Sequence, residues 1–215
     1  MANTERSLKI ATDFIKTQEG LYSLTKGGYT KGGLDTPAKT PIYAYYDRLG
    51  GIWTIGWGTT RTPDGQKFDG NYVITKAEAD KRIYEEAAKW EKYISTRLPK
   101  DRMNDNQYAV MISLAYNAGG GNLMKSRIPS ALNRNAPSQE VANIIRDSMV
   151  TAAKSGGQKV RGLINRRERE AQLYLTPVSG LGRGGGVNKG KNVALYVGIA
   201  IVSVGASLYL YNKYA

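Results

Sequence analysis

The sequence predicts an α+β domain that has a small β-containing lobe, a larger helical lobe and a cleft between them. Short β-prone runs separated by glycine and proline occupy residues 23–65, which indicates hairpins and loops. Apolar residues recur at the helical period through much of residues 75–175. The chain therefore divides into a domain at 1–176, a Gly-rich linker at 177–192 and a transmembrane helix at 193–211.

The composition limits the chemistry that this chain can perform. The net charge is +13, and only four of the 31 basic residues lie in residues 177–215, so residues 1–176 carry +9. A field of that sign attracts nucleic acid, anionic lipid or bacterial wall polymer, and it also favours plain solubility. Cysteine and histidine are both absent, which excludes disulfides, a thiol nucleophile and the usual neutral-pH base. Any acid–base chemistry must therefore use carboxylates.

Residues 4–18 are predicted to form an amphipathic helix, because apolar residues recur there every three or four positions. Glu19 follows Ile15 by four residues and so extends the apolar face of this helix, which Gly20 ends. A carboxylate on an apolar face must be paired, protonated or functional. Glu19 is therefore the first candidate for a catalytic acid.

The next segment is predicted to contain a β-hairpin. Residues 23–41 form a Gly- and Pro-rich loop with room for a small hairpin of its own. The β-prone runs 42–46 and 52–57 are then joined through Gly50-Gly51, a strong turn signal. Asp47 lies at the shoulder of this turn and Thr54 lies on the returning strand, so both side chains are expected to face one cleft.

The rest of the domain is predicted to be helical. Thr75-Lys-Ala-Glu78 is a capping box, and Asn104-Asp-Asn-Gln107 begins a helix whose body is apolar nearly all round, as a central helix would be. Further helices are expected at 126–134, 138–154 and 162–175.

Residues 193–211 carry no charge and span roughly 28 Å as a helix, enough to cross a bilayer. Tyrosines lie near both ends of this run, and basic residues flank it. A buried C-terminal helix is the alternative, but a Gly-rich tether favours an anchor.

Together these motifs resemble the phage-type lysozymes, the T4-lysozyme-like muramidases of glycoside hydrolase family 24. The resemblance covers residues 5–175. It includes Glu19-Gly20, Tyr45-x-Asp47, Thr54-Ile-Gly-Trp-Gly58, Ser113-Leu-Ala-Tyr-Asn117 and Gly162-Leu-x-x-Arg166-Arg167-x-x-Glu170.

The resemblance implies hydrolysis of the β-1,4 bond between N-acetylmuramic acid and N-acetylglucosamine in peptidoglycan, with no cofactor and no metal. By position, Glu19 is the general acid, Asp47 the second carboxylate and Thr54 the hydroxyl that holds water. An apolar position favours the protonated form that a general acid needs. Taken singly, Glu19 is more typical of a helix end, Asp47 of a turn and Thr54 of a strand, and only their combination indicates catalysis. Tyr45, Trp57 and Asn117 are expected to bind substrate.

Two features depart from the family pattern. Residues 20–46 form a longer segment between the acid and the aspartate, and the step from Asp47 to Thr54 is one residue longer. A lytic transglycosylase acting on the same bond is the first alternative, since it needs Glu19 but no water-orienting carboxylate. A non-catalytic, membrane-tethered wall-binding or virion structural protein is the second. A nucleic-acid partner is not expected, because no aromatic–basic interleaving supports it.

The expected partners are peptidoglycan strands and a lipid bilayer that holds the C-terminal helix, with other virion membrane proteins as further candidates. Charged residues interrupt every apolar run near the N-terminus, so no secretory signal is expected. The basic residues before the span outnumber those after it, which predicts a catalytic domain on the cytoplasmic side of a host inner membrane, or carriage in a virion internal membrane. The enzyme would serve either penetration of a host cell or lysis.

Overall fold

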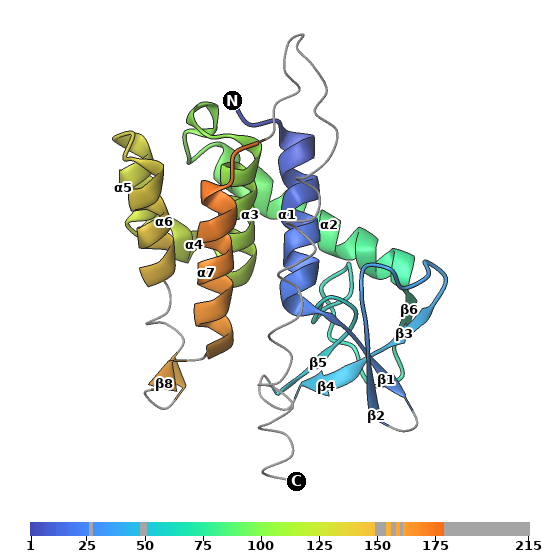
Figure 1. The fold of residues 1–215 in the computed structure, drawn as a ribbon. Coiled ribbons are helices and arrows are strands. Elements are labelled where there is room, and N and C mark those ends of the chain that lie inside the picture. The colour runs from blue at the N-terminus through green and yellow to red at the C-terminus, as the bar shows by residue number, and fades with distance from the viewer. Residues whose placement is uncertain (26–27, 48–50, 149–153, 156–157, 160, 179–215) are drawn as a thin grey trace, which may run out of the picture. The chain divides into compact units, whose positions relative to one another are not determined.

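The computed structural model describes residues 1–178 except 26–27, 48–50, 149–153, 156–157 and 160 (Figure 1). Met1–Val178 form one compact unit. Nearly all of the predicted linker and the whole predicted transmembrane helix lie outside the described residues. Within the part that is described, no helix is both long and apolar enough to cross a bilayer.

The described elements confirm an α+β domain. Its helices are α1 (Thr4–Glu19), α2 (Lys76–Ser95), α3 (Asp105–Ala118), α4 (Gly120–Lys125), α5 (Ile128–Asn133), α6 (Ser138–Asp147) and α7 (Arg161–Leu175), with a 3₁₀ turn at Lys100–Arg102. Its strands are β1 (Leu21–Thr25), β2 (Gly28–Gly32), β3 (Pro41–Tyr43), β4 (Tyr45–Asp47), β5 (Ile52–Thr54), β6 (Val73–Thr75), β7 (Lys154–Ser155) and β8 (Gln158–Lys159). Strands β1–β6 gather beside the C-terminal end of α1 and the N-terminal end of α2 (Figure 1).

Helix α3 is the centre of the helical part and packs against α1, α2, α4 and α7. Its body from Tyr108 to Ala115 is buried on every side, as the apolar sequence predicts. The predicted capping box is present: Asn104 Oδ1 accepts from the Gln107 backbone N–H at 2.9 Å, and Gln107 Oε1 accepts from the Asn104 N–H at 3.0 Å. These contacts satisfy backbone donors at the start of the helix that have no partner within it.

The strands pair differently from the simplest prediction. Strands β4 and β5 pair as an antiparallel hairpin, as expected, but the first β-prone run is split at Ala44. Strand β3 pairs with β6, which puts Ile42 opposite Ile74. Both of these side chains are buried, so the pairing adds apolar surface to the core that a longer β4–β5 hairpin would leave exposed. The loop predicted at 23–41 contains most of a second hairpin, β1–β2.

Three helix predictions need correction. The helix expected at 138–154 ends at Asp147, and Lys154–Ser155 is instead strand β7. The Thr75 hydroxyl accepts from the Glu78 N–H at 3.1 Å, but the Glu78 carboxylate binds Arg82, so only half of that capping box forms. The Gly-rich segment after α3 ends the helix at Gly119 and then begins the short helix α4, which the sequence did not indicate.

A polar cluster around Asp80 joins the segment that follows β5 to helices α1 and α2. The Trp57 indole N–H donates to Asp80 at 2.8 Å, and Lys16 and Lys76 pair with the same carboxylate at 2.9 and 2.5 Å. Burial alone would raise the pKa of Asp80, but hydrogen bonds from Lys76, Lys16 and Trp57 lower it below its ordinary value. The Asp80 carboxylate is therefore stabilised in its charged form.

We expect Asp80→Asn to lower the free energy of unfolding by about 1–2 kcal/mol at pH 7, because the charged acceptor is lost. A lowered folded-state pKa gives a contribution that is complete above about pH 4 and is lost as the pH falls below it. Urea unfolding should therefore show a smaller loss at pH 3 than at pH 7. Asp13→Asn, which removes only an exposed pair with Lys9, is the control and should have little effect at either pH. Equal losses for Asp80→Asn at both pH values would contradict this role of its charge.

Candidate active site

The hairpin β4–β5 brings Asp47 and Thr54 to one face. Tyr45 lies opposite Thr54, and Asp47 lies opposite Ile52. Side chains directly opposite in an antiparallel pair share a face, as do residues two apart on a strand. Asp47 and Thr54 therefore share a face of the hairpin, which agrees with the sequence prediction. Thr54 is buried, and its hydroxyl lies 3.4 Å from the Ile52 carbonyl oxygen, a long and weak hydrogen bond.

Glu19 lies beside the segment that leaves this hairpin. A Cβ placed on Gly58 would be 3.4 Å from Glu19 Oε2, so the last glycine of the Thr-Ile-Gly-Trp-Gly motif adjoins the carboxylate. The same segment is held against α2 at Gly56, which has φ +61 and where a Cβ would come within 2.9 Å of the Ala79 Cβ. Only glycine permits this backbone conformation and this close approach without strain. The helix end and the hairpin are thus fixed next to one another.

The Glu19 carboxylate pairs with Arg166 of α7. Arg166 Nη1 donates to Glu19 Oε1 at 2.5 Å, and the Glu19 side chain is 27% exposed. The sequence predicted apolar surroundings for this carboxylate, because Arg166 is too distant in the chain to be recognised as its partner. Of the three possibilities for this carboxylate, the structure shows the paired one, since the Arg166 guanidinium contacts Glu19.

A network of buried ion pairs supports Arg166. Glu170 is fully buried and accepts from Ser113 Oγ at 2.7 Å and from Arg166 Nε at 3.3 Å. Its second oxygen lies 3.0 Å from Arg167 Nε, and Arg167 in turn donates to the Asn117 side-chain oxygen. Buried charges are tolerated only when they are paired in this way.

Burial and the neighbouring charges shift the pKa values of residues in and around this network. Burial lowers the pKa of Arg166, but the carboxylates of Glu19 and Glu170 outweigh burial and raise it above the usual arginine value. Burial lowers the pKa of Arg167 more than Glu170 raises it. Burial also raises the pKa of Tyr116, and the negative charge of Glu19 raises it further. Tyr116 is therefore within electrostatic reach of Glu19.

The three residues that were expected to bind substrate occupy different environments. Tyr45 is half-buried on the same hairpin face as Thr54. Asn117 is exposed at the end of α3, next to Arg167. Trp57 is only 1% exposed and donates to Asp80, so its burial argues against direct contact with a substrate and indicates a packing role.

Sequence reasoning gave no role to Arg166, Glu170 and Ser113. A signal was present, because Arg166, Arg167 and Glu170 are spaced three and four residues apart, on the helix that also buries Ala171 and Tyr174. Charged residues that share the buried side of a helix must pair with one another or with a partner elsewhere.

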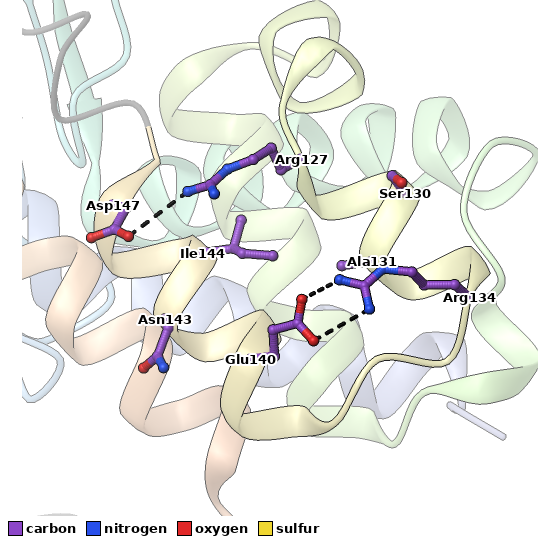
Figure 2. A pocket seen from close by; sticks show the side chains of 8 residues that line it. All are labelled: Arg127, Ser130, Ala131, Arg134, Glu140, Asn143, Ile144 and Asp147. Carbon is purple, nitrogen blue, oxygen red and sulfur yellow. Dashed lines mark hydrogen bonds and ion pairs between the residues drawn. The ribbon is translucent and has the colours of Figure 1, made fainter.

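A pocket of about 330 Å³ lies at a distance from these residues, between α5 and α6 (Figure 2). Arg134 pairs with Glu140 across it, and Arg127 lies 3.8 Å from Asp147. None of Glu19, Asp47 and Thr54 lines this pocket, so it is not the candidate site. In the described part of the chain, no three acidic side chains gather in a way that would hold a metal ion.

The fold is that of the lysozyme-like α+β proteins. The structure is similar to that of the endolysin from Escherichia coli O157:H7 phage FAHEc1, with a TM-score of 0.61 and 26% identity over 81% of this chain and 94% of the endolysin. The sequence is 31% identical to the SAR-endolysin of Haemophilus phage HP1 over 58% of this chain and 67% of the relative. It is 30% identical to the endolysin of Salmonella phage P22 over 63% of this chain and 87% of the relative.

The phage lysozyme family model matches residues 41–170, and the chain belongs to this family. It is therefore an enzyme of the lysozyme type that hydrolyses peptidoglycan. The matched residues include Asp47, Thr54 and the α7 network, whereas Glu19 and the hairpin β1–β2 precede them. Several other phage endolysins are longer, and the chain spans 43% to 50% of their length.

We expect Glu170→Gln to lower the free energy of unfolding by about 3–5 kcal/mol, because it removes the carboxylate that two buried guanidinium groups share. Urea unfolding of the purified protein measures this. Glu168→Gln on the same helix is a matched control, since Glu168 pairs with Arg146 near the surface and should contribute less than about 1 kcal/mol. If the two variants lose equal stability, the buried network does not stabilise the domain.

Proposed function

We propose that this lysozyme hydrolyses the β-1,4 bond between N-acetylmuramic acid and N-acetylglucosamine. The observation that carries the proposal is the placement of Glu19. Arg166 holds one of its oxygens, and the other adjoins Gly58, which leaves the hairpin that carries Asp47 and Thr54 on one face. An acid and a second carboxylate on separate elements of one site are the pair that glycoside hydrolysis requires.

Glu19 is the general acid in this proposal. The glycosidic oxygen must receive a proton as its bond to the sugar carbon breaks, and the chain has no histidine to supply one. Because Arg166 binds Oε1, we assign the proton transfer to Oε2, the oxygen that lies beside Gly58. Arg166 acts as a positioning residue, since a carboxyl fixed in one orientation loses less freedom in the transition state.

In this proposal, Asp47 and Thr54 act on the sugar and on the incoming water, whereas Glu19 acts on the leaving oxygen. Positive charge develops on the sugar as the bond breaks, and an ionised Asp47 stabilises that charge and orients the incoming water. The Thr54 hydroxyl accepts or donates a hydrogen bond to the same water. A lytic transglycosylase, which closes a 1,6-anhydro ring in place of adding water, needs neither group. Their common face therefore favours hydrolysis over the transglycosylase alternative.

The test of this assignment is Glu19→Gln in a peptidoglycan digestion assay. The amide cannot donate the proton, so activity should fall by about 100-fold to 10,000-fold. The fold should survive, because the amide oxygen can still accept from Arg166, and circular dichroism and thermal unfolding check this. Activity close to that of the wild type would remove Glu19 from the chemistry and would defeat hydrolysis and transglycosylation alike.

The same assay tests whether the second carboxylate is Asp47 or Asp35. Asp47→Ala should lose orders of magnitude of activity, and Thr54→Ala should lose less, since each 1.4 kcal/mol of transition-state stabilisation is worth about tenfold in rate. Asp35 is exposed in the longer segment before β3 and serves as the control carboxylate. If Asp35→Ala is inactive while Asp47→Ala is active, the assignment of Asp47 is wrong.

We further propose that residues 193–211 anchor the enzyme in a membrane through the tether 177–192. The support is the uncharged run, its terminal tyrosines and its basic flanks. The basic bias keeps the catalytic domain on the cytoplasmic side of a host inner membrane, and a virion internal membrane would carry the same topology. Stored in this way, the enzyme would act either when the phage enters a cell or when progeny are released.

Full-length protein should require detergent and should stay with membranes through an alkaline carbonate wash. A protein that ends at Val178, the last residue of the compact unit, should be soluble and fully active on isolated peptidoglycan. Val202→Lys, in the middle of the run, should weaken insertion by about 2.5–3.5 kcal/mol. The anchor proposal fails if the full-length chain is soluble without detergent.

A further inference from the structure

The hairpin β1–β2 places a cation and an aromatic ring against Gly20, the residue that follows Glu19. Its register puts Tyr22 opposite Lys31, so the two side chains share one face. The Lys31 Nζ lies 5.8 Å from the centroid of the Tyr22 ring, within the range of a cation–π contact. The family model begins after this hairpin, at residue 41.

The glycine that follows the acid fixes the position of this pair. Gly20 has φ +71, and a Cβ placed there would lie 3.0 Å from Tyr22 Cε2 and 3.4 Å from Lys31 Cε. The tyrosine ring and the lysine stem therefore both lie against the backbone next to Glu19. A larger residue than glycine would push them away, besides straining the backbone.

The hairpin β1–β2 contacts β3, β4 and the segment that follows β5. Tyr22 forms a β-bridge with Gly56, and its ring lies 5.9 Å from the Tyr45 ring in an edge-on arrangement. Ser23 Oγ accepts from the Tyr43 backbone N–H at 3.0 Å, and the neighbouring Leu21 is buried. Burial raises the pKa of Tyr22, so its ring stays neutral. Tyr22 thus connects Lys31 to the face that carries Thr54.

The Lys31 charge is exposed, and it forms no ion pair with an acid among the residues that the structure describes. Most other lysines near the site differ in this respect, because Lys16 and Lys76 are both paired with Asp80. A cation that is anchored through its stem yet unpaired at its tip can bind an anion with little loss of conformational freedom.

We propose that Lys31, positioned by Tyr22, forms a substrate subsite that binds a carboxylate of the peptidoglycan strand beside the bond to be cleaved. This inference rests on the proposed function, which supplies a substrate whose muramic acid carries a lactyl group and, attached to it, a stem peptide. The stem peptide, or the lactyl group where no stem is attached, supplies a carboxylate on only one of the two alternating sugars. Binding of that carboxylate would set which sugar occupies the position next to Glu19.

The test compares Lys31→Met, which keeps the aliphatic stem and removes the charge, with Lys39→Met. Lys39 is exposed in the same segment, so this control makes an equal change of net charge. With the full-length enzyme and soluble glycan strands that carry stem peptides, Lys31→Met should raise KM about twofold to fivefold with kcat unchanged, as expected for one exposed ion pair. Lys39→Met should leave both constants unchanged.

Chemical conversion of the substrate carboxylates to amides tests whether charge is responsible. On amidated strands, wild type and Lys31→Met should have the same KM. An amidase that removes the stems frees the lactyl carboxylate, which is an amide in intact strands. Loss of the difference between wild type and Lys31→Met on such strands assigns the native contact to the stem peptide, and a surviving difference shows that Lys31 also binds a carboxylate at the lactyl position. The inference is overturned if Lys31→Met matches wild type on native strands, or if its KM rises equally on amidated strands.

A binding measurement keeps this inference separate from the proposed function. In a Glu19→Gln background, the Kd for native strands should rise when Lys31→Met is added and should not rise with Lys39→Met. Absence of cleavage by the wild type would defeat the proposed function alone. Equal Kd values with and without the Lys31 charge would defeat the subsite.

Discussion

The contact between Glu19 and Arg166 is the interaction on which the site depends. It joins the end of the first helix to the last one, and it continues through Glu170 to Ser113 of the central helix and through Arg167 to Asn117. Isolated charges at these depths would be strongly unfavourable, so each member requires the others. The orientation of Glu19, the proposed catalytic acid, therefore depends on the helical part of the domain.

The sequence predicts the elements well where a local pattern decides them. The helix that ends at Glu19, the turn into Ile52 and the capping box at Asn104 are all confirmed because a few neighbouring residues determine each one. The partner of Glu19 could not be predicted from such patterns, since 147 positions separate Glu19 from Arg166. The pairing of Ile42 with Ile74 was missed for the same reason, because burial across the domain outweighs the continuity of a local β-prone run.

Trp57 illustrates how burial adds information that a family motif does not contain. Its position between Gly56 and Gly58 favoured a substrate contact, whereas the structure places its ring in the core and its indole N–H on Asp80. The Gly- and Pro-rich segment before β3, residues 23–41, contains more regular structure than its composition indicates. It was predicted as a loop with room for a small hairpin, and the structure has the hairpin β1–β2, which places Tyr22 and Lys31 against Gly20, the residue after Glu19. Departure from the family pattern here is the basis of the proposed Lys31 subsite.

The measurement that tests the account most directly is mass spectrometry of the glycan ends released from purified peptidoglycan. Hydrolysis assisted by Asp47 and Thr54 adds water across the bond, so the account predicts new reducing ends of N-acetylmuramic acid. Fragments that end in 1,6-anhydro-N-acetylmuramic acid, lighter by one water, would contradict the roles of Asp47 and Thr54. Reducing ends of N-acetylglucosamine would contradict the choice of bond.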